Sequence, residues 1–208
     1  MKIEGNKVQQ MINDIIRSSK ISTLIEQIEV TDKTFLSEVL KETKNKKART
    51  ALVKNKVRQI IDEKAHLNPV YYEKMKERLE AIIREEREER KEDADYFNRY
   101  EDILMDLYGQ EEERKKLGFT NAFEFAVYET LLKEVDDANI SKDITKKVFE
   151  GIKEEITNIP DWQNKLTSQK KLESTIYDIL NETGNKKIEN NIDDIIEQVI
   201  ELAKRNLR

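Results

Sequence analysis

Apolar residues recur along this chain at steps of three and four, the period of one face of an α-helix. The clearest stripe follows an Asn68-Pro69 pair and consists of Tyr72, Met75, Leu79 and Ile82. We predict that Asn68 caps the N-terminus of a helix and that Pro69 lies in its first turn. Backbone N–H groups in the first turn have no acceptor within the helix, so proline loses no hydrogen bond there. Together with the apolar and basic stretch 48–61, this pattern predicts two amphipathic helices that meet at a corner.

The N-terminal part of the chain shows shorter stripes. Residues 8–16 and 24–28 each place isoleucine, leucine, valine or methionine on one helical face. Thr31 or Asp32 predicts the cap of a further helix, whose apolar residues lie between positions 35 and 40. These patterns predict short helices joined by polar links.

Two later helices have predicted ends. The aromatic and aliphatic stripe over 96–108 stops just before Gly109, which we predict to be a left-handed C-terminal cap. Asn121, with Glu124 three residues later, predicts a capping box at the start of another helix. The buried side of that helix is expected to consist of Phe123, Val127, Leu131 and Val135.

The last third of the chain predicts three more helical segments. Isoleucine and valine at four-residue intervals over 144–156 predict a helix in which Gly151 is a tolerated weak point. Asp161 predicts the cap of the next helix, with Trp162 just inside it. After a turn at Gly184, the apolar stripe over 188–202 predicts one final helix.

A run of charged residues over 84–93 interrupts these stripes, and it contains only Arg, Lys, Glu and Asp. Opposite charges four residues apart, such as Arg84 and Glu88, support a helix by a few tenths of a kcal/mol each. No residue in the run needs burial. We therefore predict one long charged helix that projects into water or lies over a partner.

The composition agrees with a helical fold. Charged residues make up 39% of the 208 residues and hydrophobic ones 37%, with two prolines and five glycines. This mixture is typical of long helices that face solvent on one side, and it argues against a β fold or a disordered tail. We predict an all-α protein, an irregular multi-helix bundle of about eight to ten helices.

The absence of certain residues and segments predicts the cellular compartment of the protein and its relation to membranes. The sequence has no cysteine, so it has no disulfide framework and no thiolate site. No apolar run reaches the roughly 20 residues that span a bilayer, and the residues after Met1 lack the apolar core of a signal peptide. We expect a soluble, cytoplasmic protein with no membrane partner.

The sequence offers no residues for a catalytic centre. The glycines at positions 5, 109, 118, 151 and 184 do not form a phosphate-binding loop. His66 is the only histidine, so a Ser-His-Asp triad and a multi-histidine metal site lack their parts. We therefore expect no catalytic residue, no cofactor and no metal in this chain.

Three motifs in the same order carry a family resemblance. They are the Asn68-Pro-Val-Tyr-Tyr corner, the Thr120-Asn-Ala-Phe-Glu-Phe-Ala-Val-Tyr segment and Asp161-Trp-Gln-Asn-Lys165. Together they resemble the C-terminal helical region of the R subunits, the motor and nuclease subunits, of type I restriction enzymes. The resemblance covers about residues 46–208, which we predict to be that domain. Residues 1–45 are predicted to be N-terminal helices that join it, so that the whole is one structural unit.

The resemblance implies a role in assembly. Helical surfaces of such a domain would dock the ATP-dependent translocase and endonuclease subunit onto the methyltransferase and specificity core, and the parent enzyme would cleave unmodified foreign DNA. The expected partners are the modification and specificity subunits and the rest of the R subunit, and the parent enzyme would need ATP and Mg²⁺. Candidate partner contacts are Tyr71, Tyr72, Arg84, Arg87 and Trp162. For Trp162, a core anchor is the simpler interpretation.

Two other functions are compatible with the sequence. One is a DNA-contacting module that uses the basic stretch 41–58, with Lys44, Lys46, Lys47 and Arg49 as candidates. The net charge of −5 gives no overall attraction to DNA, and a run of charge is more often a solvated face. The other is a helical scaffold unrelated to restriction.

Overall fold

The computed structural model describes residues 34–88 and 93–207. Of these residues 85% are helical, in nine α-helices and without a strand, which confirms the all-α prediction. The helices predicted over 8–16 and 24–28, and the caps at Thr31 and Asp32, lie outside the described residues. None of the helices within the described ranges combines the length and the apolar character that crossing a membrane requires.

The chain forms two compact units. Within the described residues, unit 1 takes the chain up to Ile60 and from Arg78 to Tyr108, and unit 2 takes Ile61–Glu77 and Gly109 onward. The chain therefore enters unit 2 twice. The predicted boundary between residues 45 and 46 and the prediction of one structural unit stay predictions.

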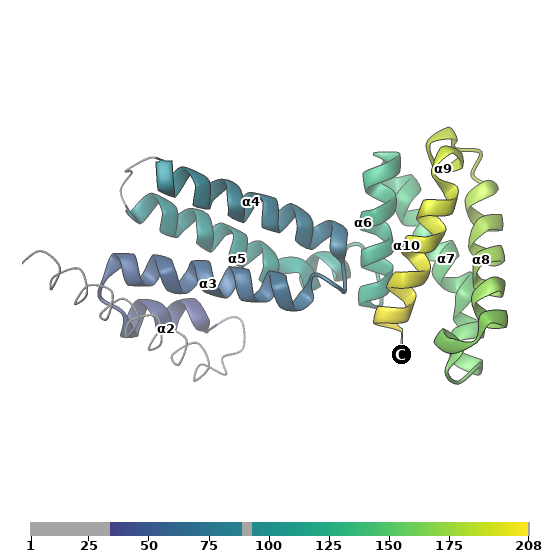
Figure 1. Cartoon of the computed structure of the whole chain (residues 1–208), viewed down its shortest axis with the longest axis horizontal. Helices are drawn as coiled ribbons and strands as arrows, with labels where there is room; N and C mark the ends of the chain where they lie inside the picture. The colour runs from purple at the N-terminus through teal and green to yellow at the C-terminus, as the bar shows by residue number, and fades with distance from the viewer. Residues whose placement is uncertain (1–33, 89–92, 208) are drawn as a thin grey trace, which may run out of the picture. The chain divides into compact units, whose positions relative to one another are not determined.

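Unit 1 contains α2 (Phe35–Glu42) and most of α3 (Lys46–Lys64), α4 (Pro69–Glu88) and α5 (Asp93–Lys116), which Figure 1 shows in colours from purple through blue to teal. Ion pairs join Arg78 to Asp106 at 2.7 Å and Glu85 to Arg99 at 2.5 Å, and this reversed order makes α4 and α5 antiparallel. The buried apolar residues of unit 1 are Phe35, Val39, Leu52, Val53, Val57, Ile60, Leu79, Ile82, Tyr96, Tyr100, Ile103, Leu104 and Leu107.

The predicted corner is confirmed. Helix α4 begins at Pro69, and the side-chain oxygen of Asn68 accepts a hydrogen bond from the backbone N–H of Tyr71 at 3.2 Å. All four members of the predicted stripe, Tyr72, Met75, Leu79 and Ile82, are buried. The capping asparagine and the proline thus start the helix from local chemistry.

The larger part of unit 2 is a bundle of four helices, α6 (Ala122–Val135), α7 (Ala138–Asn158), α8 (Leu166–Asn181) and α10 (Ile192–Asn206) (Figure 1). Each helix packs on two others, in the cyclic order α6, α7, α8, α10. The short α9 (Lys186–Asn190) and the 3₁₀ turn η1 (Trp162–Asn164) complete it. The capping box of Asn121 and Glu124 is confirmed.

Gly151 has a packing role that its sequence position did not reveal. A Cβ atom placed there would lie 2.9 Å from the Cδ1 atom of Ile179 and 3.1 Å from the Cγ2 atom of Thr175. The glycine therefore lets α7 approach α8 closely, at the cost of a weaker intrinsic helix preference. The prediction of a helix through this glycine is confirmed, because α7 runs from Ala138 to Asn158.

The predicted cap at Gly109 is wrong. Helix α5 continues through Gly109 to Lys116, and the left-handed residue is Gly118, with φ of 78°. The N–H of Phe119 donates to the carbonyl of Arg114 at 3.1 Å, and the N–H of Gly118 donates to that of Lys115 at 2.9 Å. These two bonds form a Schellman motif, which satisfies the last carbonyls of the helix.

Two predicted starts near the C-terminus also differ. Asp161 makes no side-chain cap bond, has φ of 58° and precedes only the η1 turn, so α8 begins later, at Leu166. Its left-handed backbone differs from the extended backbone of an N-cap residue. The predicted final helix is divided at Asn191 into α9 and α10.

The charged run 84–93 is divided between two helices. Its first five residues end α4 at Glu88, Asp93 begins α5, and residues 89–92 lie outside the described residues. Glu85 and Glu86 are partly buried, and both form hydrogen bonds within unit 1. These two glutamates therefore differ from the prediction that the run projects into water or lies over a partner.

Candidate functional site

Two of the predicted partner contacts, Tyr71 and Tyr72, are buried in unit 2. The ring of Tyr71 lies 5.3 Å from that of Tyr72, edge to face, and 6.1 Å from that of Phe125. The Tyr72 hydroxyl donates a hydrogen bond to the side-chain oxygen of Gln110 at 2.9 Å. These contacts hold the start of α4 against α6. A role for either tyrosine in binding a partner stays a prediction.

The other three candidates lie apart from these tyrosines. Trp162 is 2% exposed and belongs to the core of the four-helix bundle, as the core-anchor interpretation predicted. Arg84 and Arg87 are exposed on the part of α4 that belongs to unit 1. The structure thus divides the five candidates between two units and does not unite them in one site.

One of the four predicted DNA contacts, Arg49, forms hydrogen bonds inside unit 1. Lys44, Lys46 and Lys47 are exposed. Arg49 instead donates from Nε to the carbonyl of Thr43 and from Nη2 to the carbonyl of Leu40 at 2.8 Å. An arginine that satisfies the carbonyls at the end of α2 is a structural element, and it is less available for phosphate.

Further basic residues of the stretch 41–58 also have structural partners. The Lys54 ammonium lies 2.9 Å from the Glu86 carboxylate and 5.7 Å from the centre of the Tyr100 ring. The Lys56 ammonium lies 5.8 Å from the centre of the Phe35 ring. The basic stretch is thus divided between charges that hold unit 1 together and charges that face solvent.

The Glu86 carboxylate joins three helices of unit 1. It accepts hydrogen bonds from the Lys54 ammonium of α3 and, at 2.7 Å, from the Tyr100 hydroxyl of α5. Burial raises the pKa of Glu86, but the two hydrogen bonds and the charge of Lys54 outweigh burial and lower it overall. Burial, with the hydrogen bond to Glu86, raises the pKa of Tyr100. The acid stays ionised and the phenol protonated near neutral pH, so the cluster serves structure.

Unit 2 contains two ion pairs in which one partner is buried. Lys74 of α4 lies 2.9 Å from Glu129 of α6, whose side chain is 8% exposed. Lys171 of α8 lies 2.5 Å from Glu155 of α7. The hydrogen bond from Lys171 is the main cause of the lowered pKa of Glu155. Each pair connects two helices that form the core of unit 2.

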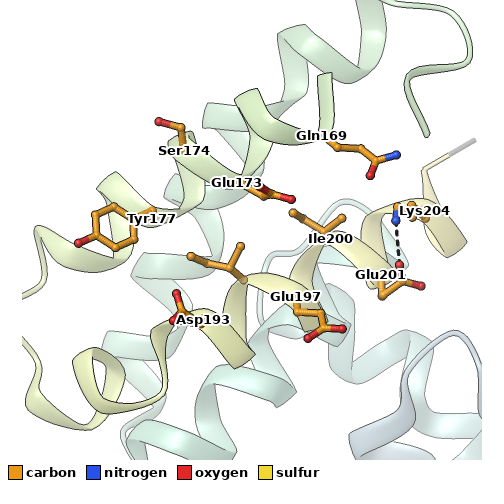
Figure 2. Close-up of a pocket in the computed structure, with 10 residues that line it drawn as sticks. Gln169, Glu173, Ser174, Tyr177, Asp193, Glu197, Ile200, Glu201 and Lys204 are labelled. Carbon is orange, nitrogen blue, oxygen red and sulfur yellow. Dashed lines mark hydrogen bonds and ion pairs between the residues drawn. The ribbon is translucent and has the colours of Figure 1, made fainter. Parts of the chain in front are cut away.

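A hollow of about 670 Å³ lies on unit 2 between α8 and α10. Figure 2 shows Glu173 of α8 and Ile200 of α10 on its facing sides, with the Lys204–Glu201 pair at one end. Its lining combines apolar side chains with four carboxylates and one lysine, namely Gln169, Glu173, Ser174, Tyr177, Asp193, Ile196, Glu197, Ile200, Glu201 and Lys204.

A second hollow, of about 240 Å³, lies on the other side of Glu197 and Glu201. It is mainly apolar and is formed by the start of α4, by α6 and by α10, through Pro69, Val70, Thr130, Glu197, Gln198, Glu201, Leu202 and Arg205. Glu197 and Glu201 line both hollows. We call the stretch of α10 that carries these two residues the α10 ridge.

The sequence did not single out the α10 ridge. Its carboxylates stand four residues apart beside the apolar stripe of α10, a pattern that also describes an ordinary amphipathic helix. Only the packing of α8 and α6 on either side turns the pattern into two hollows. Within residues 34–88 and 93–207, no group of three or more His, Cys, Asp or Glu residues is placed to hold a metal ion.

The comparisons with known proteins identify the family. The model of the family described as type I restriction enzyme HindI endonuclease subunit-like, C-terminal, matches residues 4–205. The chain therefore belongs to this family, the C-terminal region of a type I restriction endonuclease subunit, as its motifs predicted. The match also includes most of residues 1–45, which no motif had assigned. The alternative prediction, a helical scaffold unrelated to restriction, is therefore wrong. No curated protein and no solved structure matches the chain.

Proposed function

We propose that this chain is the assembly domain of a type I restriction R subunit, which docks the translocase and endonuclease parts of that subunit onto the methyltransferase and specificity core. The observation that carries this proposal is the family match over residues 4–205. The parent enzyme cleaves unmodified foreign DNA, and its ATP and Mg²⁺ sites lie in the rest of the R subunit. This chain contributes contacts and no turnover of its own.

The helical architecture supports a docking role. Packed helices present rigid surfaces whose shape is fixed before a partner arrives, which lowers the entropic cost of binding. Unit 2 offers such surfaces at the two hollows beside the α10 ridge, and ion pairs with one buried partner join helices of this unit. The partner and its docking face are part of the proposal.

Binding to the purified modification and specificity core tests the proposal. The 208-residue chain, shown to be folded by circular dichroism, is titrated into the core in a calorimeter, and the intact R subunit is titrated in parallel. We expect both to bind and to compete with each other. A folded chain that fails to bind while the intact R subunit binds would contradict a docking role for this domain.

DNA contact is a second candidate, and one observation favours it. Lys44, Lys46 and Lys47 are exposed around the start of α3, which has no acidic residue in its first turn. Exposed lysines beside the positive end of a helix attract phosphate. Such binding would weaken steeply with added salt, because bound phosphates release counterions.

Charge reversal at the three lysines tests DNA contact. The variant with Lys44, Lys46 and Lys47 each changed to Glu is compared with a variant that reverses Lys146, Lys165 and Lys170, which are also exposed. If unit 1 contacts DNA, only the first variant loses affinity for duplex DNA in fluorescence anisotropy, and the salt dependence becomes shallower. Equal affinity of the two variants, or no binding by the wild type, removes this candidate.

A further inference from the structure

The hollow between α8 and α10 leaves apolar surface uncovered. Tyr177 is 45% exposed on its α8 side, and Leu166 is 66% exposed on the same face of α8. Ile196 and Ile200 form the floor on the α10 side. Two of the five large hydrophobic side chains that are exposed within residues 34–88 and 93–207 therefore lie on one face of α8, and one of them, Tyr177, lines this hollow.

Three of the four carboxylates around this floor lack an ion pair within the part of the chain that the structure describes. Glu173, Asp193 and Glu197 form no ion pair with another described residue, whereas Glu201 is paired with Lys204 at 2.9 Å and with Arg205 at 3.6 Å. The hollow thus has an excess of negative charge directly beside its apolar floor.

The like charges on α10 lower the stability of this helix. Asp193, Glu197 and Glu201 stand four residues apart, so their like charges repel along one side of the helix. Asp193 gains from its place in the first turn, but Glu197 lies beyond that turn. A cationic group seated on the α10 ridge would remove this repulsion.

The second hollow adds a place for an apolar side chain. It lies across the α10 ridge from the first and is bounded by Val70 and Leu202, with Thr130 buried at α6. A segment that crosses the ridge can therefore place basic side chains over Glu197 and apolar side chains on both sides. An amphipathic helix with lysine or arginine beside its apolar stripe has this chemistry.

We propose that the α10 ridge and its two hollows are the seat of a basic amphipathic helix of the methyltransferase and specificity core. This assignment rests on the proposed function and adds to it the docking face and the chemistry of the docked segment. The charge of the face excludes a nucleic-acid occupant, because phosphates would meet the carboxylates of Glu173, Asp193 and Glu197.

A matched pair of charge-reversal variants tests the assignment. The ridge variant combines Glu173→Lys with Glu197→Lys, and the control variant combines Glu150→Lys with Glu189→Lys. All four glutamates are exposed, and the control residues lie on α7 and α9 outside the two hollows. Both variants change the net charge equally, and circular dichroism with thermal unfolding confirms that both are folded.

The readout is the dissociation constant for the purified modification and specificity core. We expect the ridge variant to bind at least about tenfold more weakly and the control to stay within about twofold, because docking depends on local charge complementarity. Equal binding by the ridge variant and the wild type overturns the assignment while the proposed function stands. Absence of wild-type binding overturns the proposed function and this assignment together.

A photo-crosslink identifies the docked segment. Tyr177 is replaced by p-benzoylphenylalanine in the full chain, with the same replacement at Ile140, which is 40% exposed on α7, as the control. We expect only position 177 to capture a core peptide that is rich in Lys and Arg and has apolar residues at steps of three and four. Capture of an acidic peptide, of a second copy of this chain or of DNA, or no capture at position 177, overturns the assignment.

Discussion

Two glycines, Gly109 inside α5 and Gly118 just after it, differ in backbone conformation and in their effect on the helix. Gly109 lies inside the helix with no atom near its absent Cβ, whereas Gly118 has φ of 78° and ends the helix. The sequence favoured Gly109 as the cap because the apolar stripe stops just before it. The helix continues because its polar last turns are supported locally, as in the Glu111–Arg114 pair at 2.8 Å.

Alanine at these two positions is expected to act in opposite directions. Gly109→Ala raises the free energy of unfolding by about 0.5–1 kcal/mol, because alanine loses less backbone freedom in a helix than glycine does. Gly118→Ala lowers it by about 1 kcal/mol or more, because alanine is strained at positive φ. Urea unfolding followed by circular dichroism measures both. A stabilised Gly118→Ala variant would contradict the left-handed cap.

The stability of unit 1 is expected to depend on the charge of Glu86. Its pKa is lower in the folded state than in the unfolded chain, so its contribution is complete above the unfolded pKa of about 4.3 and is lost as pH falls through the folded value. Glu86→Gln removes this contribution. Relative to wild type, the variant is expected to lose more stability at pH 7 than at pH 3.

Glu80→Gln is the control for this measurement, because Glu80 is exposed on the same helix and its side chain has no ion pair with another described residue. Thermal unfolding at both pH values reports the difference. A Glu86→Gln variant whose loss of stability is the same at pH 3 and pH 7 would contradict the ionised, hydrogen-bonded state of Glu86.

At the scale of the element, α6 differs most from its prediction. The four-residue steps correctly predicted Phe123, Val127, Leu131 and Val135 as buried, but Phe125, Tyr128 and Glu129 on other faces are buried as well. Helix α6 packs on α7 and α10, while the start of α4 contacts it through Tyr71 and Lys74. Periodicity reveals one apolar face, and the second face is buried only through contacts distant in sequence.

The burial of Glu129 makes Lys74 a sensitive position. Lys74→Ala is expected to lower the free energy of unfolding by about 1–3 kcal/mol, because it leaves a carboxylate that is 8% exposed without its cation. Lys147→Ala is the control, since the Lys147–Asp143 pair is more than 60% exposed on both sides and is expected to contribute little to stability. Equal losses in urea unfolding would argue against a structural role for the Lys74–Glu129 pair.

At the scale of the whole molecule, motifs identified the family, and helical periodicity with composition identified the all-α class, but neither predicted the division into two units. That division depends on contacts between segments far apart in the chain, since unit 2 combines Ile61–Glu77 with the chain from Gly109. The proposed docking face was also beyond sequence reasoning, because the α10 ridge gains its two hollows only from α4, α6 and α8.

A truncated chain tests the composition of unit 2. A fragment of residues 109–208 keeps the four-helix bundle but loses the corner, the Tyr71 ring on Phe125 and the bonds from Arg205 and Asn206 to the carbonyls of His66 and Leu67. We expect this fragment to unfold at a lower temperature than the full chain and to bind the dye ANS at its uncovered α6 surface. An unfolding temperature equal to that of the full chain would show that residues 61–77 contribute little.

The double entry of the chain into unit 2 has a consequence for its synthesis. Residues 61–77 leave the ribosome before α6 exists, and translation adds only about 5–20 residues per second. During those seconds α6 is not yet present to cover the rings of Tyr71 and Tyr72, so the nascent chain exposes their aromatic surface. Chaperone demand is therefore expected to peak before α6 emerges, although the finished protein buries both tyrosines.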